Sequence, residues 1–232
     1  MGRKLLFILL IGFISAQAQD LEPTTLFSDA IGRNIKSYKA KSQRAYADQN
    51  FDLAEKLYDS LIKYVVNGST LDNFQVRKIS GRKIKLHDFE KPVFLMTYAS
   101  WCTPGVGEIP ALNEIASKYH KDIDFVILFW DTKKRVKKIA GEYNSKINVV
   151  YVDELENNHC HTIQTMKHSL GFPTSFFIDA DKKILDVRRG ALHHYNEAYE
   201  VSYELNYTSF LNGISLLKTL PRNAEGLVID HP

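Results

Sequence analysis

Cys102 lies in a segment whose residue types could support thiol chemistry, residues 101–110, which read Trp-Cys-Thr-Pro-Gly-Val-Gly-Glu-Ile-Pro. The apolar run at 92–98 before it predicts a buried strand, and apolar residues at helical spacing predict a helix over 111–119 after it. Cys102 is then expected in a strand-to-helix turn, where the helix begins. Unpaired N–H groups and the positive end of the helix dipole favour a thiolate there, and the thiolate is the form that attacks disulfides.

Two interpretations of Cys102 follow from these residue types. It is either an exposed nucleophile that forms a mixed disulfide with a client, or a buried free cysteine that packs as a small apolar side chain. Trp101 would either cover one side of the thiol and shape client access, or simply pack. Pro104 is expected in the first helical turn, where its missing N–H has no cost.

Two motifs give the chain a resemblance to a known family. Trp-Cys-x-Pro at 101–104, followed by Glu-Ile-Pro at 108–110, resembles the active-site segment of thioredoxin-fold proteins, specifically the exported TlpA/ResA branch. Gly-Phe-Pro-Thr-Ser-Phe-Phe-Ile-Asp at 171–179 resembles the family's cis-proline loop and the strand after it. The resemblance implies an α/β fold, namely a thioredoxin-like mixed sheet with flanking helices, an N-terminal β-hairpin and an N-terminal helical extension.

The resemblance also implies roles for residues around the thiol. Pro173 would be cis, and the loop with Phe172 and Thr174 would pair with an extended client segment beside Cys102. The alternative is an ordinary turn before a strand. Glu108 would assist proton transfer at Cys102, the alternative being an exposed helix glutamate.

The chain departs from the family pattern at two positions. Gly105 stands where the family has its second motif cysteine, so a mixed disulfide cannot be resolved from within the motif. Met96 stands where thioredoxins have a buried aspartate.

Cys160 is the second cysteine of the chain and lies in a His-Cys-His triplet at 159–161. It is either a distant resolving cysteine, a thiol without a role, or part of a metal site. Consecutive residues point in different directions, so we expect no metal and no cofactor.

The first residues predict a signal peptide over 1–18. Arg3 and Lys4 precede an apolar run at 5–16 and an Ala-Gln-Ala exit. The run is shorter than the roughly 20 residues that span a membrane. We expect a secreted or periplasmic protein without stable membrane insertion after cleavage; the alternative is a membrane tether formed by an uncleaved N-terminal helix.

The charge balance predicts no polyanionic partner. The formal net charge is +3, and loss of Arg3 and Lys4 would leave +1 (3 − 2), which gives no reason to expect nucleic acid or a membrane surface. The lysine-rich helix expected over 131–143 is interpreted as a solvated face rather than an anion site.

Behind the signal peptide, the sequence predicts a helical extension at 19–70, a thioredoxin-like domain at 71–220 and a tail at 221–232. The extension has helical spacing over 28–47 and 51–65, resembling a single TPR-like hairpin, and either packs on the domain or docks a partner. The other expected elements are a hairpin at 74–79 and 83–86, strands at 123–130, 147–152, 174–178 and 183–187, and helices at 166–170 and 206–217.

These features predict an exported thiol–disulfide oxidoreductase that acts through Cys102. Its partners would be client proteins or small thiols, joined by a mixed disulfide, together with an electron donor that the sequence does not identify. With no second motif cysteine, the protein would trap mixed disulfides, isomerise them, or need Cys160 or a small thiol to resolve them. The alternative is a binding module of the same fold that has lost catalysis.

Overall fold

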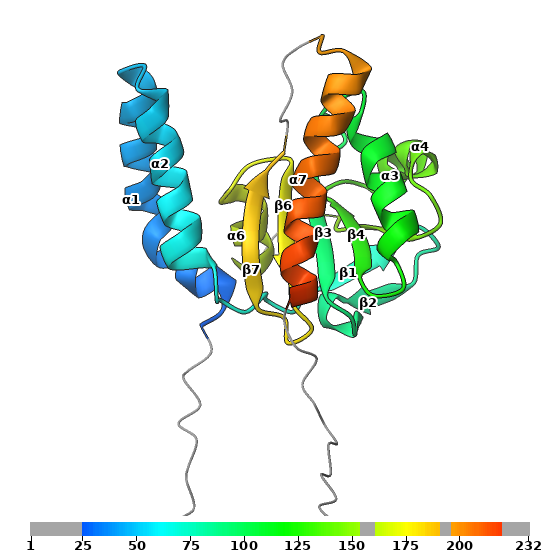
Figure 1. Cartoon of the computed structure of the whole chain (residues 1–232). Helices are drawn as coiled ribbons and strands as arrows, with labels where there is room; N and C mark the ends of the chain where they lie inside the picture. Colours follow the sequence, from blue (N-terminus) through cyan, green and yellow to red (C-terminus); the bar gives the residue numbers. More distant parts are fainter. Residues whose placement is uncertain (1–24, 154–160, 191–195, 220–232) are drawn as a thin grey trace, which may run out of the picture.

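The computed structural model describes residues 25–153, 161–190 and 196–219. A seven-stranded mixed sheet forms the centre, in the order β2-β1-β5-β4-β3-β6-β7 (Figure 1). Its strands are β1 (Gln75–Lys78), β2 (Lys83–Lys85), β3 (Val93–Tyr98), β4 (Asp124–Phe129), β5 (Ile147–Tyr151), β6 (Thr174–Ile178) and β7 (Ile184–Arg189). β3, β4 and β5 run parallel, and the remaining neighbours pair antiparallel. The predicted thioredoxin-like mixed sheet is confirmed.

Helices cover both faces of this sheet. They are α1 (Phe27–Ala47), α2 (Phe51–Leu61), the π-helix η1 (Ile62–Val66), the 3-10 helix η2 (Leu86–Asp88), α3 (Glu108–Tyr119), α4 (Lys133–Ile139), the 3-10 helix η3 (Ala140–Glu142), α6 (His161–His168) and α7 (Tyr199–Thr219). α1, η1 and α6 pack in one apolar core, and α3 and α7 pack in a second core on the opposite face.

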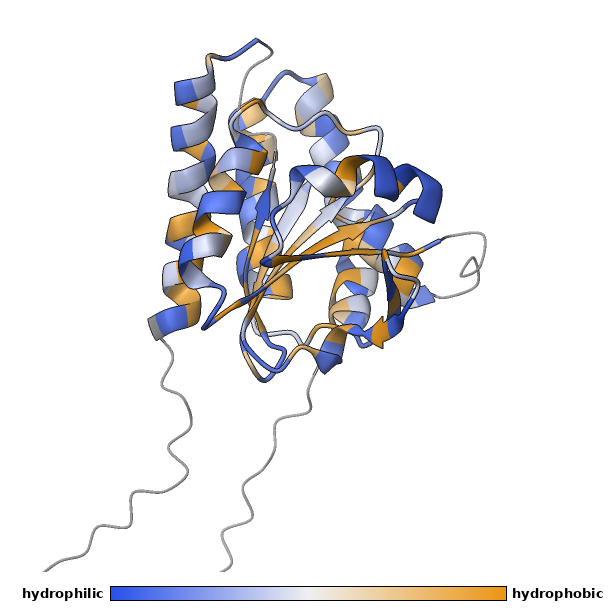
Figure 2. Cartoon of the chain, turned by 90° about the vertical axis from the view of Figure 1, so that its right-hand side faces the viewer, coloured by the Kyte–Doolittle hydropathy of each residue, from blue (hydrophilic) through white to orange (hydrophobic). Residues whose placement is uncertain are grey.

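The central strands explain why two cores are possible. All six residues of β3 and all five of β6 are buried, so both sides of these strands meet apolar neighbours. Such continuous apolar runs are typical of strands covered on both faces. Figure 2 shows them as an orange layer between helices with hydrophilic outer surfaces.

The N-terminal helices pack on the sheet through β6 and β7. The ring of Phe27 meets that of Phe176 edge-on, with centroids 5.7 Å apart. The guanidinium of Arg189 lies 3.8 Å from the centroid of the Tyr58 ring and donates to the hydroxyl of Tyr38 at 2.5 Å. The two helices therefore share the core of the sheet.

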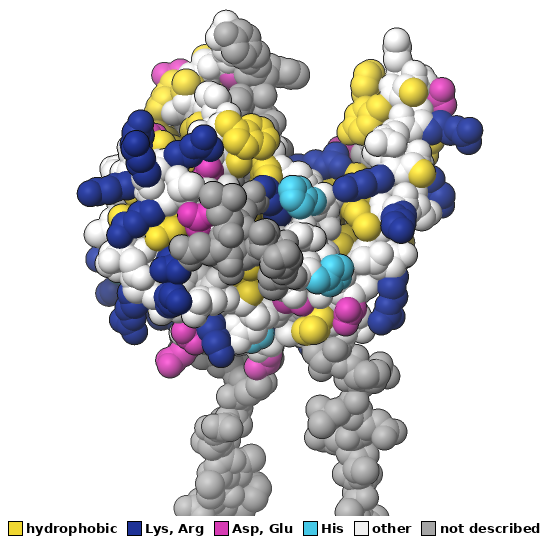
Figure 3. Space-filling model, turned by 180° about the vertical axis from the view of Figure 1, so that it is seen from behind, with side chains coloured by type: hydrophobic (Ala, Val, Ile, Leu, Met, Phe, Trp, Pro, Cys, Tyr) yellow, Lys and Arg dark blue, Asp and Glu magenta, His cyan; other side chains and the backbone are white. Residues whose placement is uncertain are grey.

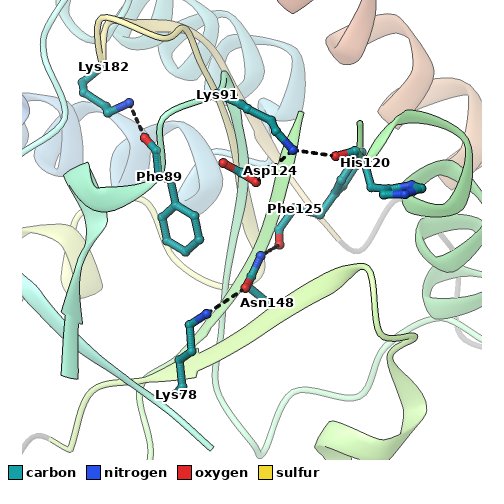
Figure 4. A network of polar contacts seen from close by, with 8 residues as sticks. All are labelled: Lys78, Phe89, Lys91, His120, Asp124, Phe125, Asn148 and Lys182. Carbon is teal, nitrogen blue, oxygen red and sulfur yellow. Dashed lines mark hydrogen bonds and ion pairs between the residues drawn. The ribbon is translucent and has the colours of Figure 1, made fainter. Parts of the chain in front are cut away.

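Lysine side chains tie loops together where β3 and β4 begin (Figure 4). The buried ammonium of Lys182 donates to the carbonyl of Phe89 at 2.6 Å, and Lys91 donates to the carbonyl of His120 at 2.9 Å. Cys102 follows the other end of β3, so this network holds the sheet at the end away from the thiol.

Several predicted helix bounds need correction. The closing helix begins at Tyr199 instead of 206, and the rings of Tyr199, Tyr203 and Tyr207 stack along its first turns. The lysine-rich helix spans only Lys133–Ile139 and continues as η3. α6 begins at His161 rather than 166. Across the described ranges, no helix combines the length and apolarity that crossing a membrane requires.

Candidate functional site

The pairing of β3 with β6 brings the two predicted motifs to one edge of the sheet. Thr97 lies opposite Thr174, and its hydroxyl donates to the Thr174 carbonyl at 3.3 Å. The peptide bond between Phe172 and Pro173 is cis, as predicted. The ring of Phe172 meets that of Trp101 edge-on at 6.1 Å between centroids. The cysteine motif and the cis-proline loop are therefore neighbours in the fold.

Cys102 is half-buried in a turn rather than at a helix start. Its N–H donates to the carbonyl of Ala99 at 2.9 Å, and residues 103–105 are not helical. α3 begins only at Glu108, so Pro104 precedes the helix instead of occupying its first turn. The prediction that the helix begins at Cys102 is therefore wrong.

Gly107 explains why the helix begins no earlier than Glu108. Glycine is a poor helix former, and the segment carries it at both 105 and 107. The Gly107 N–H donates to Ser202 Oγ at 3.1 Å, and a Cβ at this position would overlap the backbone nitrogen of Tyr203. The start of α3 is thus held directly against the backbone of α7.

The surroundings of Cys102 raise the pKa of its thiol. Burial is the largest cause, and the negative charges of Glu108 and Asp131 act in the same direction. A separate hydrogen bond between the thiol itself and the Ala99 backbone lowers the pKa and opposes them. The prediction of a favoured thiolate is therefore wrong at this site.

Glu108 is buried at the first position of α3. Only 2% of its surface is exposed, and Oε1 accepts a hydrogen bond from the Tyr98 hydroxyl at 2.8 Å. The alternative of an exposed helix glutamate is therefore wrong. Burial and the charge of Glu108 together raise the pKa of both Tyr98 and Tyr143. The acid/base role of Glu108 remains a prediction.

Asp131 is a site residue that the sequence reasoning missed. It follows β4 and is buried, and Oδ2 accepts the Ser100 N–H at 2.5 Å while Oδ1 lies 3.4 Å from Nη1 of Arg135. The carboxylate thereby fixes the turn that ends at Cys102. An available signal was its place just after a buried strand, since parallel strands end at one edge of a sheet.

The predicted client-binding residues differ in exposure. Trp101 is 72% exposed and Phe172 is half-buried, so both rings offer apolar surface beside the thiol. Thr174 is buried, and its hydroxyl donates to the carbonyl of Gly171 at 2.9 Å. Its side chain is therefore turned inward, away from any client.

Two further predicted positions lie within the packed interior. Pro173 is buried, and its carbonyl accepts the N–H of Gly190 at 2.8 Å. Met96 is 1% exposed in the core beneath α3. The position of the thioredoxin aspartate is thus occupied by an apolar side chain with no proton to exchange.

Cys160 lies outside the described residues, so its distance from Cys102 is not defined. His161 is the first residue of α6. In the part of the chain that the structure describes, no three His, Cys, Asp or Glu side chains form a group that could hold a metal ion.

Comparison with known proteins identifies the family of the chain. The family model "AhpC/TSA family" matches residues 68–187, more than half of the chain. The chain is 33% identical over 126 residues to the thiol-disulfide oxidoreductase ResA of Bacillus thuringiensis subsp. konkukian, covering 53% of this chain and 69% of that protein. It is 35% identical over 123 residues to a ResA of Bacillus cereus, covering 51% and 67%. Among solved structures, a putative thiol:disulfide interchange protein DsbE from Chlorobium tepidum is similar at 23% identity and a TM-score of 0.47, covering 64% of this chain and 97% of that one. The chain therefore belongs to the AhpC/TSA family.

Proposed function

We propose that this protein is an exported thiol–disulfide oxidoreductase that works through a single motif cysteine, Cys102. The observation that carries the proposal is the contact between Trp101, beside the thiol, and Phe172, which precedes the cis-proline. The contact supports the proposal that a client strand pairs with the loop before the cis-proline while its disulfide meets Cys102. The relatives named thiol-disulfide oxidoreductase support the same reaction class.

In the proposed reaction, the Cys102 thiolate attacks one sulfur of a client disulfide. A new disulfide joins Cys102 to the client, the client's other sulfur leaves as a thiolate, and the Cys102 proton passes to solvent. No oxidation or reduction occurs overall in this step. Gly105 supplies no second thiol, so a thiol from outside the motif must release the client.

The raised pKa of Cys102 affects both the rate of attack and the lifetime of the mixed disulfide. A smaller fraction of the thiol is ionised at neutral pH, so attack is slow. A thiol of high pKa is also a poor leaving group, so the mixed disulfide persists once it has formed. We therefore expect a protein that holds its clients covalently for long times.

The proposal includes release of the client from the mixed disulfide and export of the protein. Cys160 or a small thiol would attack the mixed disulfide and free the client. The apolar run at 5–16 and the Ala-Gln-Ala exit support cleavage after residue 18 and a secreted or periplasmic location.

A second candidate function is a binding module without catalysis. The raised pKa of Cys102 and the glycine at 105 both favour it, because a thiol that rarely ionises and has no motif partner contributes little chemistry. In that case the exposed Trp101 and half-buried Phe172 would bind a partner without forming a covalent bond.

Glutathione disulfide separates the two candidates. The protein lacking residues 1–18 would be incubated with it and analysed by mass spectrometry under non-reducing conditions, alongside Cys102→Ser and Cys160→Ser variants. We expect a glutathione adduct on Cys102 that disappears in Cys102→Ser and lasts longer in Cys160→Ser. Absence of any adduct above the pKa of the thiol would overturn the oxidoreductase proposal and favour the binding module.

A further inference from the structure

We infer that Cys102 acts on acidic clients, whose disulfides are drawn to it by a basic face beside the thiol. We define the basic face as Arg82 of the β1–β2 turn and five side chains of α4, namely Lys133, Lys134, Arg135, Lys137 and Lys138. The inference rests on the proposed function and adds the class of its substrate.

The basic face joins two elements that are far apart in the chain. α4 and its flanks, residues 132–141, hold five cations and no Asp or Glu. A Cβ added to Gly81 would lie 3.6 Å from the ammonium of Lys133, so the turn carrying Arg82 lies against this helix. Figure 3 shows dark blue side chains along the margin of the molecule where α4 and the β1–β2 hairpin lie.

Asp131 connects the basic face to the turn that carries the thiol. Arg135 lies 3.4 Å from one oxygen of Asp131, whose other oxygen holds the N–H of Ser100, two residues before Cys102. The charge of Asp131 also acts on Lys167 of α6, where it partly opposes the lowering of the pKa by burial. Arg135 of α4 and Lys167 of α6 are thus both influenced by the carboxylate that holds the Ser100 N–H.

The described residues of α4 and the β1–β2 hairpin favour an acidic protein over single-stranded nucleic acid. Among the described residues of α4 and the β1–β2 hairpin, no large apolar side chain is exposed. Single-stranded nucleic acid is held by stacking on aromatic rings, and such rings are absent from this described surface. Clustered cations with no stacking platform instead suit carboxylates spread along an acidic polypeptide.

Net charge alone conceals this surface. The formal charge of +3 averages cations and acids over the whole chain, and it gave no reason to expect an anionic partner. Steering depends on the local field, which reaches about one Debye length, roughly 8 Å at physiological salt. A basic face at the rim of the site can therefore act on an approaching client even though the thiol itself lies beside two carboxylates.

Three matched peptides test the inference. Each carries one cysteine joined by a disulfide to 2-mercaptoethanol, flanked by Glu in the first peptide, Gln in the second and Lys in the third. Cys102 attacks the peptide sulfur, mercaptoethanol leaves as its thiolate, and the protein–peptide adduct is followed by mass spectrometry. The protein carries Cys160→Ser so that only Cys102 reacts. Salt is varied from about 0.01 M to about 1 M, over which the Debye length falls from about 30 Å to about 3 Å.

We expect the Glu peptide to react about tenfold faster than the Gln peptide at low salt, with the Lys peptide slower still, and the differences to vanish at high salt. Lys134→Glu/Lys138→Glu should abolish the preference, so that the Glu peptide reacts no faster than the Gln peptide with this variant. Lys56→Glu/Lys121→Glu makes the same charge change on exposed lysines of α2 and of the turn after α3, and should preserve the preference.

The peptides distinguish a failure of the inference from a failure of the proposed function. If the Gln peptide reacts but the Glu peptide gains no advantage, or if both double variants lose the preference equally, the inference is wrong and the proposed function stands. If none of the peptides reacts at any salt concentration, the proposed function fails and the inference fails with it.

Discussion

The hydroxyl of Tyr98 donates a hydrogen bond to Oε1 of Glu108 across 2.8 Å, and both residues are buried. Tyr98 ends β3 and Glu108 begins α3, so this bond spans the segment that carries the thiol. A buried carboxyl group that loses a hydrogen-bond donor is costly, because water cannot replace the lost partner.

Tyr98→Phe should therefore lower the free energy of unfolding by about 1–3 kcal/mol, measured by urea denaturation. Tyr207→Phe is the matched control, because its hydroxyl contacts the exposed Lys118 and its loss should change stability by no more than about 0.5 kcal/mol. Equal effects of the two changes would mean that the buried bond has no special weight.

Alkylation of Cys102 should show a midpoint above the free-cysteine value of about 8.5 when its rate is measured against pH. Glu108→Gln removes a negative charge that raises this pKa, so the midpoint should move down. Glu114→Gln, on the exposed side of α3, should leave it in place. A midpoint below that of free cysteine in the unmodified protein would contradict the described surroundings.

The same shift makes stability depend on pH in a defined direction. The folded state holds the Cys102 proton more tightly than the unfolded state, so the contribution of this group is complete below the unfolded pKa. It is lost as pH rises through the folded pKa. The unfolding free energy of the unmodified protein should thus fall relative to that of Cys102→Ser as pH rises above the free-cysteine pKa of about 8.5. If the unfolding free energies of the two proteins change with pH in parallel, the pKa of Cys102 is not raised by folding.

Gly107→Ala should destabilise the protein by about 1–3 kcal/mol, because the new methyl group would overlap the backbone of Tyr203. The φ of Gly107 is −96°, which alanine adopts readily, so the expected loss comes from the overlap alone. Gly141→Ala is the control, since a Cβ there meets nothing within 4 Å. A Gly107→Ala protein as stable as the control would mean that α7 moves aside without cost.

Gly105→Cys should shorten the lifetime of the mixed disulfide, because a thiol at this position can attack the Cys102 sulfur and release the client. Loss of the glutathione adduct in a Cys160→Ser background would be followed by mass spectrometry. Gly105→Ser controls for the added side chain and should leave the lifetime unchanged. An unchanged lifetime in Gly105→Cys would show that the turn holds the two positions apart.

The sequence predicted the elements that have strong local patterns. The apolar run before Cys102 became β3, and the spacing of apolar residues over 51–65 became α2 and η1. Gly81 at φ 94° forms the turn of the predicted β-hairpin. These features depend on residues close together in the chain, where periodicity and turn chemistry are informative.

The state of the thiol depends on partners that are distant in the sequence. Asp131 reaches Ser100 from the end of β4, and Ser202 and Tyr203 hold Gly107 from α7. Contrary to the expectation, the helix does not begin at Cys102, because two glycines precede it and Gly107 is held against α7. No local pattern reports such contacts, so neither the start of the helix nor the direction of the pKa shift of Cys102 was predicted correctly.

The contacts of Arg189 with the two N-terminal helices limit how far the chain can be shortened. Arg189 donates a hydrogen bond to Tyr38 and lies over the ring of Tyr58. The N–H of the next residue, Gly190, donates to the carbonyl of the cis-proline. A fragment trimmed to begin near residue 71 would release this arginine and uncover Phe176. The shortest recombinant piece worth expressing therefore starts ahead of Phe27.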